Sequence, residues 1–208
     1  MSLIEIRNLT FAYPGSFDNV FEGLNLRLDT SWRLGLVGRN GRGKTTLLHL
    51  LDGSLEGTGR LSCPERPLYF PRPVSQPQRP ALQVLMEGIP EEDEWRLLRE
   101  LHKLGLEEEL LSRPFQSLSG GEQTRARLAA LFLAEDGYPL IDEPTNHLDE
   151  EGRALAARYL RGLNRGFLLV SHDRAFLDGC VDHILALNPA GQELIRGDFS
   201  TWYREKEN

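Results

Sequence analysis

Apolar residues follow two different periods along the N-terminal part of the chain. Apolar and polar residues alternate over residues 3–11 and 24–28, which is typical of strands with one solvated face. The apolar run 34–37 indicates a strand buried on both faces instead. A helical apolar stretch over residues 45–51 follows it. The pattern therefore predicts a β-rich start that closes with a strand–loop–helix unit.

The pattern changes at a proline-rich segment. Six prolines crowd residues 64–80, which excludes a regular helix and predicts a shaped loop or crossover. Beyond it, residues 82–111 are charged, leucine-rich and helical in period. The predicted apolar face consists of Trp95, Leu98, Leu101 and Leu104, or of Leu98, Leu101 and His102. We expect a small helical subdomain over residues 81–133.

Strands and helices alternate in the rest of the chain. The predicted elements are a helix over 122–133, a strand ending at Leu140-Ile141, a helix over 150–163, and a buried strand over 167–170. Two further strands, 183–187 and 193–196, flank the turn sequence Asn188-Pro189-Ala190-Gly191 and predict a hairpin. This order is typical of an α/β fold with a parallel core sheet.

Length and composition favour one domain, residues 1–208. No apolar run approaches the roughly 20 residues that cross a bilayer, and no secretory signal is visible, so we expect a cytoplasmic protein without membrane insertion. Cys63 and Cys180 lack metal-ligand spacing and are expected to be reduced structural thiols. The net charge of −7 argues against binding nucleic acid through bulk positive charge. A nucleic-acid partner would therefore have to bind a local basic patch.

A glycine-rich segment after the buried strand matches the phosphate-binding pattern G-x-x-x-x-G-K-[ST]. Its residues are Gly38, Arg39, Asn40, Gly41, Arg42, Gly43, Lys44 and Thr45, followed by Thr46. Glycines let backbone N–H groups turn toward phosphates, and the helix N-terminus adds a positive dipole. Lys44 is expected to reach the β- and γ-phosphates, and Thr45 to place its hydroxyl on Mg²⁺. The flanking strand and helix favour this interpretation over an ordinary glycine turn.

Two carboxylates end the strand that closes on Leu140-Ile141, where open α/β sheets place their ligands. Asp142 suits the Mg²⁺ shell, directly or through water, and Glu143 is the candidate base that polarises the attacking water. A strand that ends in solvated acids is an equally good interpretation of these two residues alone. Pro139 is tolerated at the first residue of a strand but not in its middle.

Ser119 and Glu122 have the spacing of a helix capping box. A cap explains both residues but not Gly120 and Gly121 between them. An exposed helix N-terminus that approaches a phosphate closely needs small residues there. Both interpretations can hold together, because the cap orders the same N–H groups that bind an anion.

These segments together resemble the ATP-binding cassette (ABC) family over nearly the whole chain and in the family's order. The matching segments are the phosphate loop, the signature at 118–123, the acidic strand end at 138–143, and Ser171-His172-Asp173 as the histidine switch. The resemblance implies an ATPase domain that uses ATP and Mg²⁺. It also implies a P-loop NTPase fold with a mostly parallel core sheet, an N-terminal antiparallel β subdomain and a helical subdomain.

By the same resemblance, Tyr13 would stack on adenine, His172 would contact the γ-phosphate, and Asp149 would face a partner domain. The signature residues Ser119, Gly120, Gly121 and Glu122 would act in trans on the ATP of that partner. Tyr13 is otherwise a surface or core aromatic, and His172 an ordinary polar histidine. We therefore expect the isolated chain to bind Mg·ATP but to hydrolyse it slowly, and to pair with a second copy or with a missing second half.

Within the family, residues 142–149, 171–177 and 197–203 resemble the ABC-F branch. Members of that branch are soluble, carry two cassettes and act on the ribosome, so the resemblance implies a translation factor. Residues 32–44 resemble the subgroup that protects ribosomes from antibiotics. The alternative is the ATPase subunit of a membrane transporter with separate permease chains. The run 145–149 and the short stretch 72–119 favour the ribosome, whereas the acidic net charge counts against an RNA partner.

The chain departs from the family pattern in three places. The glutamine that usually senses Mg²⁺ would align near Arg72, so its identity is open between Arg72, Gln76 and Gln78. Glu122 stands where transporters usually have glutamine. Only one cassette is present, which suggests the first half of a longer protein or a stand-alone module.

Overall fold

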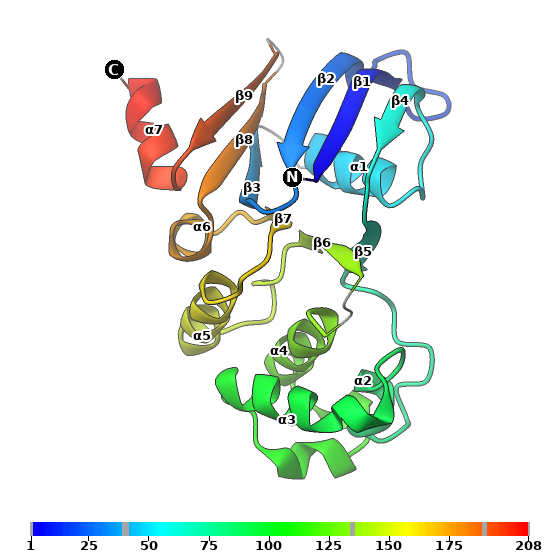
Figure 1. Ribbon diagram of the computed structural model, residues 1–208, viewed down its shortest axis with the longest axis vertical. Helices are drawn as coiled ribbons and strands as arrows, with labels where there is room; N and C mark the ends of the chain where they lie inside the picture. The colour runs from blue at the N-terminus through cyan, green and yellow to red at the C-terminus, as the bar shows by residue number, and fades with distance from the viewer. Residues whose placement is uncertain (1, 39–41, 134–135, 189–190, 208) are drawn as a thin grey trace.

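The strands of the protein form two sheets (Figure 1). We describe them from a computed structural model that covers residues 2–38, 42–133, 136–188 and 191–207. The antiparallel sheet has the order β2–β1–β4 and contains β1 (Leu3–Phe11), β2 (Phe21–Asp29) and β4 (Thr58–Ser62). The central sheet has the order β5–β6–β7–β3–β8–β9 and is parallel except for β9. Its strands are β3 (Arg33–Gly38), β5 (Arg66–Phe70), β6 (Gly137–Asp142), β7 (Phe167–Val170), β8 (His183–Asn188) and β9 (Gly191–Arg196).

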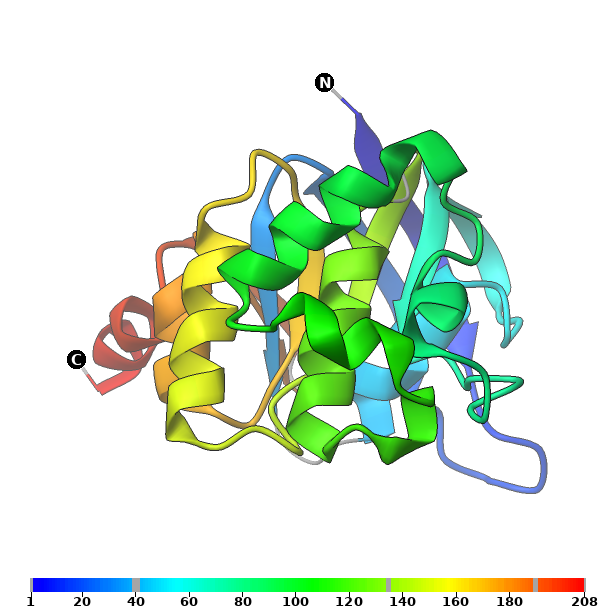
Figure 2. The same ribbon diagram turned by 90° about the horizontal axis from the view of Figure 1, so that it is seen from below.

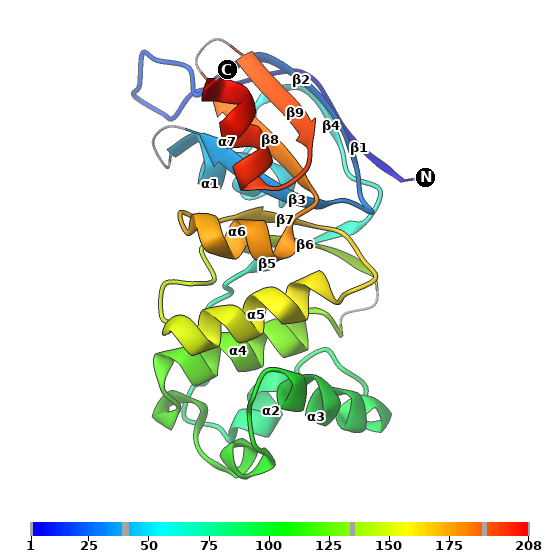
Figure 3. The same cartoon turned by 90° about the vertical axis from the view of Figure 1, so that its left-hand side faces the viewer.

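The helices are arranged in layers on both faces of the central sheet (Figure 3). α1 (Arg42–Leu51) lies between the two sheets, and α4, α5 and α6 cover the opposite face. α2 and α3 form the outermost layer, and Figure 2 shows it in front of the sheet. The bounds are α2 (Ala81–Leu85), α3 (Glu94–Lys103), α4 (Gly120–Leu131), α5 (Glu150–Arg161), α6 (Arg174–Cys180) and α7 (Phe199–Glu207), with 3-10 turns at Glu91–Asp93, Glu108–Ser112 and Phe115–Ser117.

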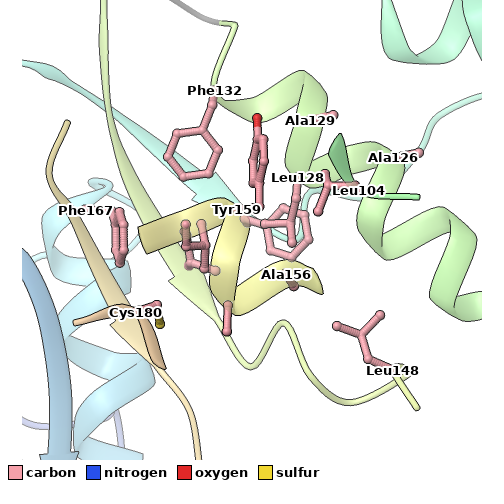
Figure 4. Close-up of a cluster of buried hydrophobic side chains, with 14 of the residues drawn as sticks. Leu104, Ala126, Leu128, Ala129, Phe132, Leu148, Ala156, Tyr159, Phe167 and Cys180 are labelled. Carbon is pink, nitrogen blue, oxygen red and sulfur yellow. The ribbon is translucent and has the colours of Figure 1, made fainter. Parts of the chain in front are cut away.

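The central strands bury both faces, which explains their unbroken apolar runs. In β7, Leu168 and Val170 join the core shared with α1 and the antiparallel sheet. Phe167 and Leu169 point to the other core, shared with α4, α5 and α6. Figure 4 shows part of that second core, where Phe132, Tyr159 and Phe167 pack edge to face at ring-centroid distances of 6.1 and 6.2 Å. The phosphate-loop helix and the helical layers are therefore packed on opposite faces of one sheet.

The structure confirms the predicted hairpin and parallel core and corrects three details. Trp95 does not belong to the apolar face of α3, because it is 59% exposed. The fully buried apolar residues are Leu97 and Leu101, together with Leu104 directly after the helix. Pro139 lies inside β6 and not at its first residue. It pairs with Leu68 of β5, but the ladder to β7 starts one residue later, at Leu140. Position 139 thus lies outside the β7 ladder, where a missing N–H is less costly.

The third correction concerns the proline-rich segment, which contains a strand. Residues 66–70 form β5 at the edge of the central sheet, with Pro67 as its second residue. An edge strand leaves one side without ladder partners, so it accepts a proline. Within the described ranges, no helix is both long and apolar enough to cross a membrane.

Candidate functional site

The carboxyl ends of three neighbouring strands position the predicted site. The order β6–β7–β3 brings together the segments that follow these strands, because parallel strands end at the same edge of a sheet. The phosphate loop follows β3, Glu143 follows β6, and Ser171 and His172 follow β7. Sequence positions about 130 residues apart therefore meet at one edge.

The described part of the phosphate loop holds a buried lysine. Lys44, whose exposure is 4%, donates from Nζ to the Gly38 carbonyl at 2.8 Å. Burial lowers the pKa of Lys44, and the carboxylates of Glu143 and Asp142 oppose this shift. Arg39, Asn40 and Gly41 lie outside the described residues, and of Arg42 only the backbone is described. Lys44 is thus bound to a carbonyl of its own loop and interacts electrostatically with the Asp142 and Glu143 carboxylates. This placement suits a cation that binds phosphate.

Gly38 is needed for space rather than for an unusual backbone conformation. A Cβ atom at this position would lie 2.5 Å from the Leu187 carbonyl oxygen of β8. A larger residue would therefore push the start of the phosphate loop away from the sheet.

Asp142 is the polar centre of the site. Its Oδ2 accepts hydrogen bonds from the Thr45 hydroxyl at 3.1 Å and from the Tyr69 hydroxyl at 2.8 Å. Its Oδ1 is buried and has no hydrogen-bond partner among the described residues. A buried carboxylate oxygen without a donor is the kind of ligand that a hard cation takes. The pair Thr45 and Asp142 therefore fits Mg²⁺, which usually binds one or two protein oxygens and completes its shell with phosphates and water.

Glu143 differs from an acid at a solvated strand end. Its backbone has a φ of +49°, a left-handed conformation that is uncommon for a residue with a side chain. The side chain is 18% exposed, its Oε2 accepts from the His172 backbone N–H at 3.2 Å, and its Oε1 lies 3.0 Å from His172 Nε2. Burial raises the pKa of Glu143, and the interactions with His172 oppose the rise. The geometry holds a proton-accepting group at a fixed position beside the switch histidine.

Tyr13 is connected to the phosphate-loop helix. Its hydroxyl and the hydroxyl of buried Thr46 share a hydrogen bond of 2.6 Å. Its ring meets Phe11 edge-on at 5.0 Å, and the residue is 37% exposed. An aromatic ring held at both ends with an open side is suited to stacking, so adenine stacking stays a prediction for this residue.

The signature segment begins α4 with the predicted capping box. The Ser119 hydroxyl accepts from the Glu122 N–H at 3.1 Å, and the Glu122 carboxylate accepts from the Ser119 N–H at 2.9 Å. A Cβ atom at Gly120 or Gly121 would meet His147 at 3.2 Å. The two glycines therefore have a packing reason within this chain, and their approach to an anion stays a prediction.

The remaining predicted residues lie on exposed loops. Asp149 caps α5 by accepting from the Gly152 N–H at 2.7 Å. Arg72, Gln76 and Gln78 follow β5 and are exposed, and the Arg72 carbonyl accepts from the Arg127 side chain. The structure does not select one of these three as the Mg²⁺-sensing residue.

Tyr69 is the site residue that sequence reasoning missed. Burial, with the hydrogen bond to Asp142, raises the pKa of its hydroxyl, and its ring lies 4.8 Å from the His49 ring of α1. In the β5–β6 register Tyr69 pairs with Leu140, so it shares a sheet face with Asp142, two residues further along. The apolar and aromatic run Leu68-Tyr69-Phe70 is a strand signal, but the neighbouring prolines obscured it.

Comparison with known proteins identifies the family. A family model described as "ABC transporter" matches residues 21–146, more than half of the chain. The chain belongs to this family. It is thus an ATP-binding cassette ATPase domain, as the four motifs implied.

Individual relatives refine this assignment. The chain is similar to "Ribosome protection protein VmlR" of Bacillus subtilis (strain 168), at 33% identity over 98% of the chain and 35% of the relative. It is also similar to "ATP-binding cassette sub-family F member 3" of Homo sapiens, at 32% identity over 88% of the chain and 27% of the relative. The chain thus spans about a third of the length of the curated relatives it matches.

The fold is shared with a solved dimeric cassette. The structure of the ATP-binding cassette MJ0796, a dimer in a post-hydrolysis state bound to ADP and Pi, matches with a TM-score of 0.77. The identity is 21%, over 93% of this chain and 99% of that one. At this identity the likeness concerns the fold alone.

Proposed function

We propose that this cassette drives a protein that acts on the ribosome, as an ABC-F translation factor or as a ribosome protection protein against antibiotics. The proposal is supported chiefly by the likeness to VmlR, which covers 98% of the chain. Two further observations agree with it: the sub-family F relative, and the run Thr145-Asn146-His147-Leu148-Asp149, whose His147 packs on the signature glycines. A cytoplasmic location and an RNA-containing partner follow from the same proposal.

In the proposed site, each residue has one task. Lys44 and the phosphate-loop backbone bind the phosphates. Tyr13 stacks on the adenine of ATP, and the buried Thr46 holds the Tyr13 hydroxyl. Thr45 and Asp142 hold Mg²⁺, which when bound neutralises charge on the phosphate oxygens. Glu143 accepts a proton from the attacking water, and its raised pKa suits a base. His172, 3.0 Å from Glu143, contacts the γ-phosphate.

The site is proposed to be complete only in a pair of cassettes. α1 and α4 lie on opposite faces of the central sheet (Figure 1), so the phosphate loop and the signature of one chain serve different nucleotides. The partner is a second copy of this chain or a second cassette of a longer protein. Closing on ATP and opening after hydrolysis then converts phosphate chemistry into motion.

The experiment that tests the ribosome partner is co-sedimentation of the Glu143→Gln variant with purified 70S ribosomes. The variant should bind ATP without turnover, so retention is expected with ATP and loss with ADP or without nucleotide. The Lys44→Ala, Glu143→Gln double variant, which should not bind ATP, is the control. Equal retention in all conditions, or none, would contradict the proposal and favour the transporter alternative, in which the cassette binds a permease. Parental hydrolysis by Glu143→Gln would separately disprove the role of Glu143.

A further inference from the structure

A pocket of about 770 Å³ joins the phosphate site to the C-terminal helix. One wall consists of Gly38, Lys44 and His172. Another wall consists of Phe199, Trp202 and Tyr203 of α7. The predicted γ-phosphate position therefore lies in the same hollow as an aromatic face of the last helix.

Arg174 connects the two walls. It is the second residue after His172 and the first of α6. Its guanidinium lies 5.2 Å from the Phe199 ring centroid and 5.4 Å from that of Tyr203, distances typical of cation–π contacts. Asp173, between His172 and Arg174, caps α6 and pairs with Arg153 of α5 at 3.3 Å. The switch loop, residues 171–173, is thus connected to α5 through Asp173 and to α7 through the adjoining Arg174.

α7 is fixed to its surroundings at a few polar points. The Ser200 backbone N–H and hydroxyl donate to the Asp178 carboxylate of α6, the first at 2.8 Å. Lys206 pairs with Glu193 of β9 at 2.8 Å. Figure 3 shows α7 lying across β8 and β9, above α6. Exposed contacts of this kind are weak individually, and Phe199 and Trp202 are only partly buried against the core, so α7 is held less firmly than the helices that cover the sheet.

The indole of Trp202 places a buried donor where α7 lines the pocket. Its Nε1–H is buried and has no hydrogen-bond partner among the described residues. A buried donor without an acceptor costs stability. Because Trp202 lines the pocket, its surroundings change if α7 moves relative to the phosphate site.

We propose that α7 senses the γ-phosphate, and that Arg174 is the positioning residue that transmits the state of His172 to it. Contact of His172 with the γ-phosphate moves the switch loop, and the guanidinium stacked on Phe199 and Tyr203 carries α7 along. α7 then changes position between the ATP and ADP states. This inference rests on the proposed placement of His172 against the γ-phosphate.

The test is the fluorescence of Trp202 in a chain carrying Trp32→Phe and Trp95→Phe. A non-hydrolysable ATP analogue with Mg²⁺ should change the emission, and ADP should not. Arg174→Ala should abolish the change while the affinity for the analogue, measured by calorimetry, stays within about twofold. If Arg174 instead bound phosphate directly, the affinity would fall about tenfold or more.

Two further variants separate coupling from loss of structure. Phe199→Leu with Tyr203→Leu removes the rings but keeps Arg174, and should abolish the change in the same way. Arg99→Ala removes an arginine of α3 that lies over the ring at position 95, in the helical layer. Made in the same chain, which already carries Trp95→Phe, this variant should leave the Trp202 response unchanged.

The outcomes distinguish this inference from the proposed function. Absence of nucleotide binding in calorimetry would contradict the proposed site itself. Binding without any change in Trp202 emission, an equal change with ADP, or a change that survives Arg174→Ala would overturn the role of α7 and leave the ATPase assignment standing.

Discussion

Individual residues of this site are held in conformations that cost stability. Glu143 combines a left-handed backbone with a mostly buried carboxylate, and such features cost roughly 1–3 kcal/mol each. Lys44 is buried opposite two carboxylates. Residues tuned for proton transfer or phosphate binding typically lie in such environments. The cost predicts that neutral substitutions here stabilise the fold.

Glu143→Gln should therefore be more stable than the parent at pH 7, by about 1 kcal/mol. Because burial raises the folded-state pKa of Glu143 above its ordinary value of 4.5, ionisation destabilises the parent as the pH rises past that value. The gain should disappear below about pH 4.5, where the carboxyl is protonated in both states. Urea unfolding of both proteins at pH 7 and pH 4 measures this difference in stability. Glu22→Gln, exposed on β2, should show no such difference, and a less stable Glu143→Gln at pH 7 would contradict the explanation.

Tyr13 allows ring and hydroxyl to be tested separately. Tyr13→Ala removes the stacking surface and should weaken ATP binding about tenfold, since stacking contributes roughly 1–3 kcal/mol. Tyr13→Phe keeps the ring and loses only the bond to Thr46, so about a twofold loss is expected. Calorimetric titration with ATP measures both. Phe17→Ala is the matched control, because Phe17 is fully exposed on the same loop. A loss confined to Phe17→Ala would assign the stacking to Phe17.

The sequence predicted those candidate site residues that lie within a recognisable motif. The phosphate loop and Asp142 fall within motifs, and the structure brings Thr45 to Asp142 as the interpretation required. Tyr69 reaches the same carboxylate from a strand in a different part of the chain. Tyr69 lies near Asp142 only because of the register between β5 and β6, and no sequence motif specifies that register. The left-handed φ of Glu143 was likewise invisible, because glutamate is not a residue that predicts it.

At the scale of elements, strands and helices were predictable where burial imposes a period. β7 was predicted with its observed bounds because all four residues are buried. β4 was missed because only one of its five residues is even partly buried, so main-chain pairing with β1 alone defines it. The face of α3 was misplaced because a tryptophan at position 95 resembled a core residue, yet its ring lies under Arg99 at the surface.

α3 carries a buried carboxylate that pairs with two cations of the same helix. Glu100 is 5% exposed, and its Oε1 accepts from Arg99 and Lys103 at 3.0 Å each. Burial raises the pKa of Glu100, but the hydrogen bonds, led by Lys103, hold it below its ordinary value of 4.5. This carboxylate thus adds stability above about pH 4.5, and the contribution is lost as the pH falls through the lower folded-state pKa.

Glu100→Gln should therefore destabilise the chain at neutral pH, by about 1–2 kcal/mol. The difference from the parent should shrink toward pH 3, because the parent carboxyl is then protonated as well. Thermal or urea unfolding followed by circular dichroism measures both conditions. Glu92→Gln, exposed in the turn before α3, is the control that should remain within about 0.5 kcal/mol of the parent. An unchanged midpoint for Glu100→Gln at pH 7 would show that the cluster does not hold α3 in place.

At the scale of the whole molecule, the two predicted halves of an ATP site lie on opposite faces of one sheet. The phosphate loop opens α1, in the layer between the sheets, and the signature opens α4, on the far side (Figure 3). A single chain therefore presents two half-sites that cannot close on each other without breaking the core between them. Two chains related by a two-fold axis would place the loop of each against the signature of the other.

This arrangement predicts that two inactive variants restore hydrolysis when mixed. Lys44→Ala disables the phosphate loop, and Ser119→Arg disables the signature, at a cost of about 1 kcal/mol for the lost cap. In a two-fold pair of these variants, one composite site keeps both the lysine and the serine. Random pairing makes half of the dimers mixed, each with one intact site of two, so the mixture should reach about a quarter of the parental rate. Phosphate release measured across mixing ratios should peak at equal amounts. If the mixture instead hydrolysed ATP at the summed rate of the separate variants, each chain would hydrolyse ATP without the signature of a partner. The position of the phosphate loop and the signature on opposite faces of the sheet would then need a different explanation.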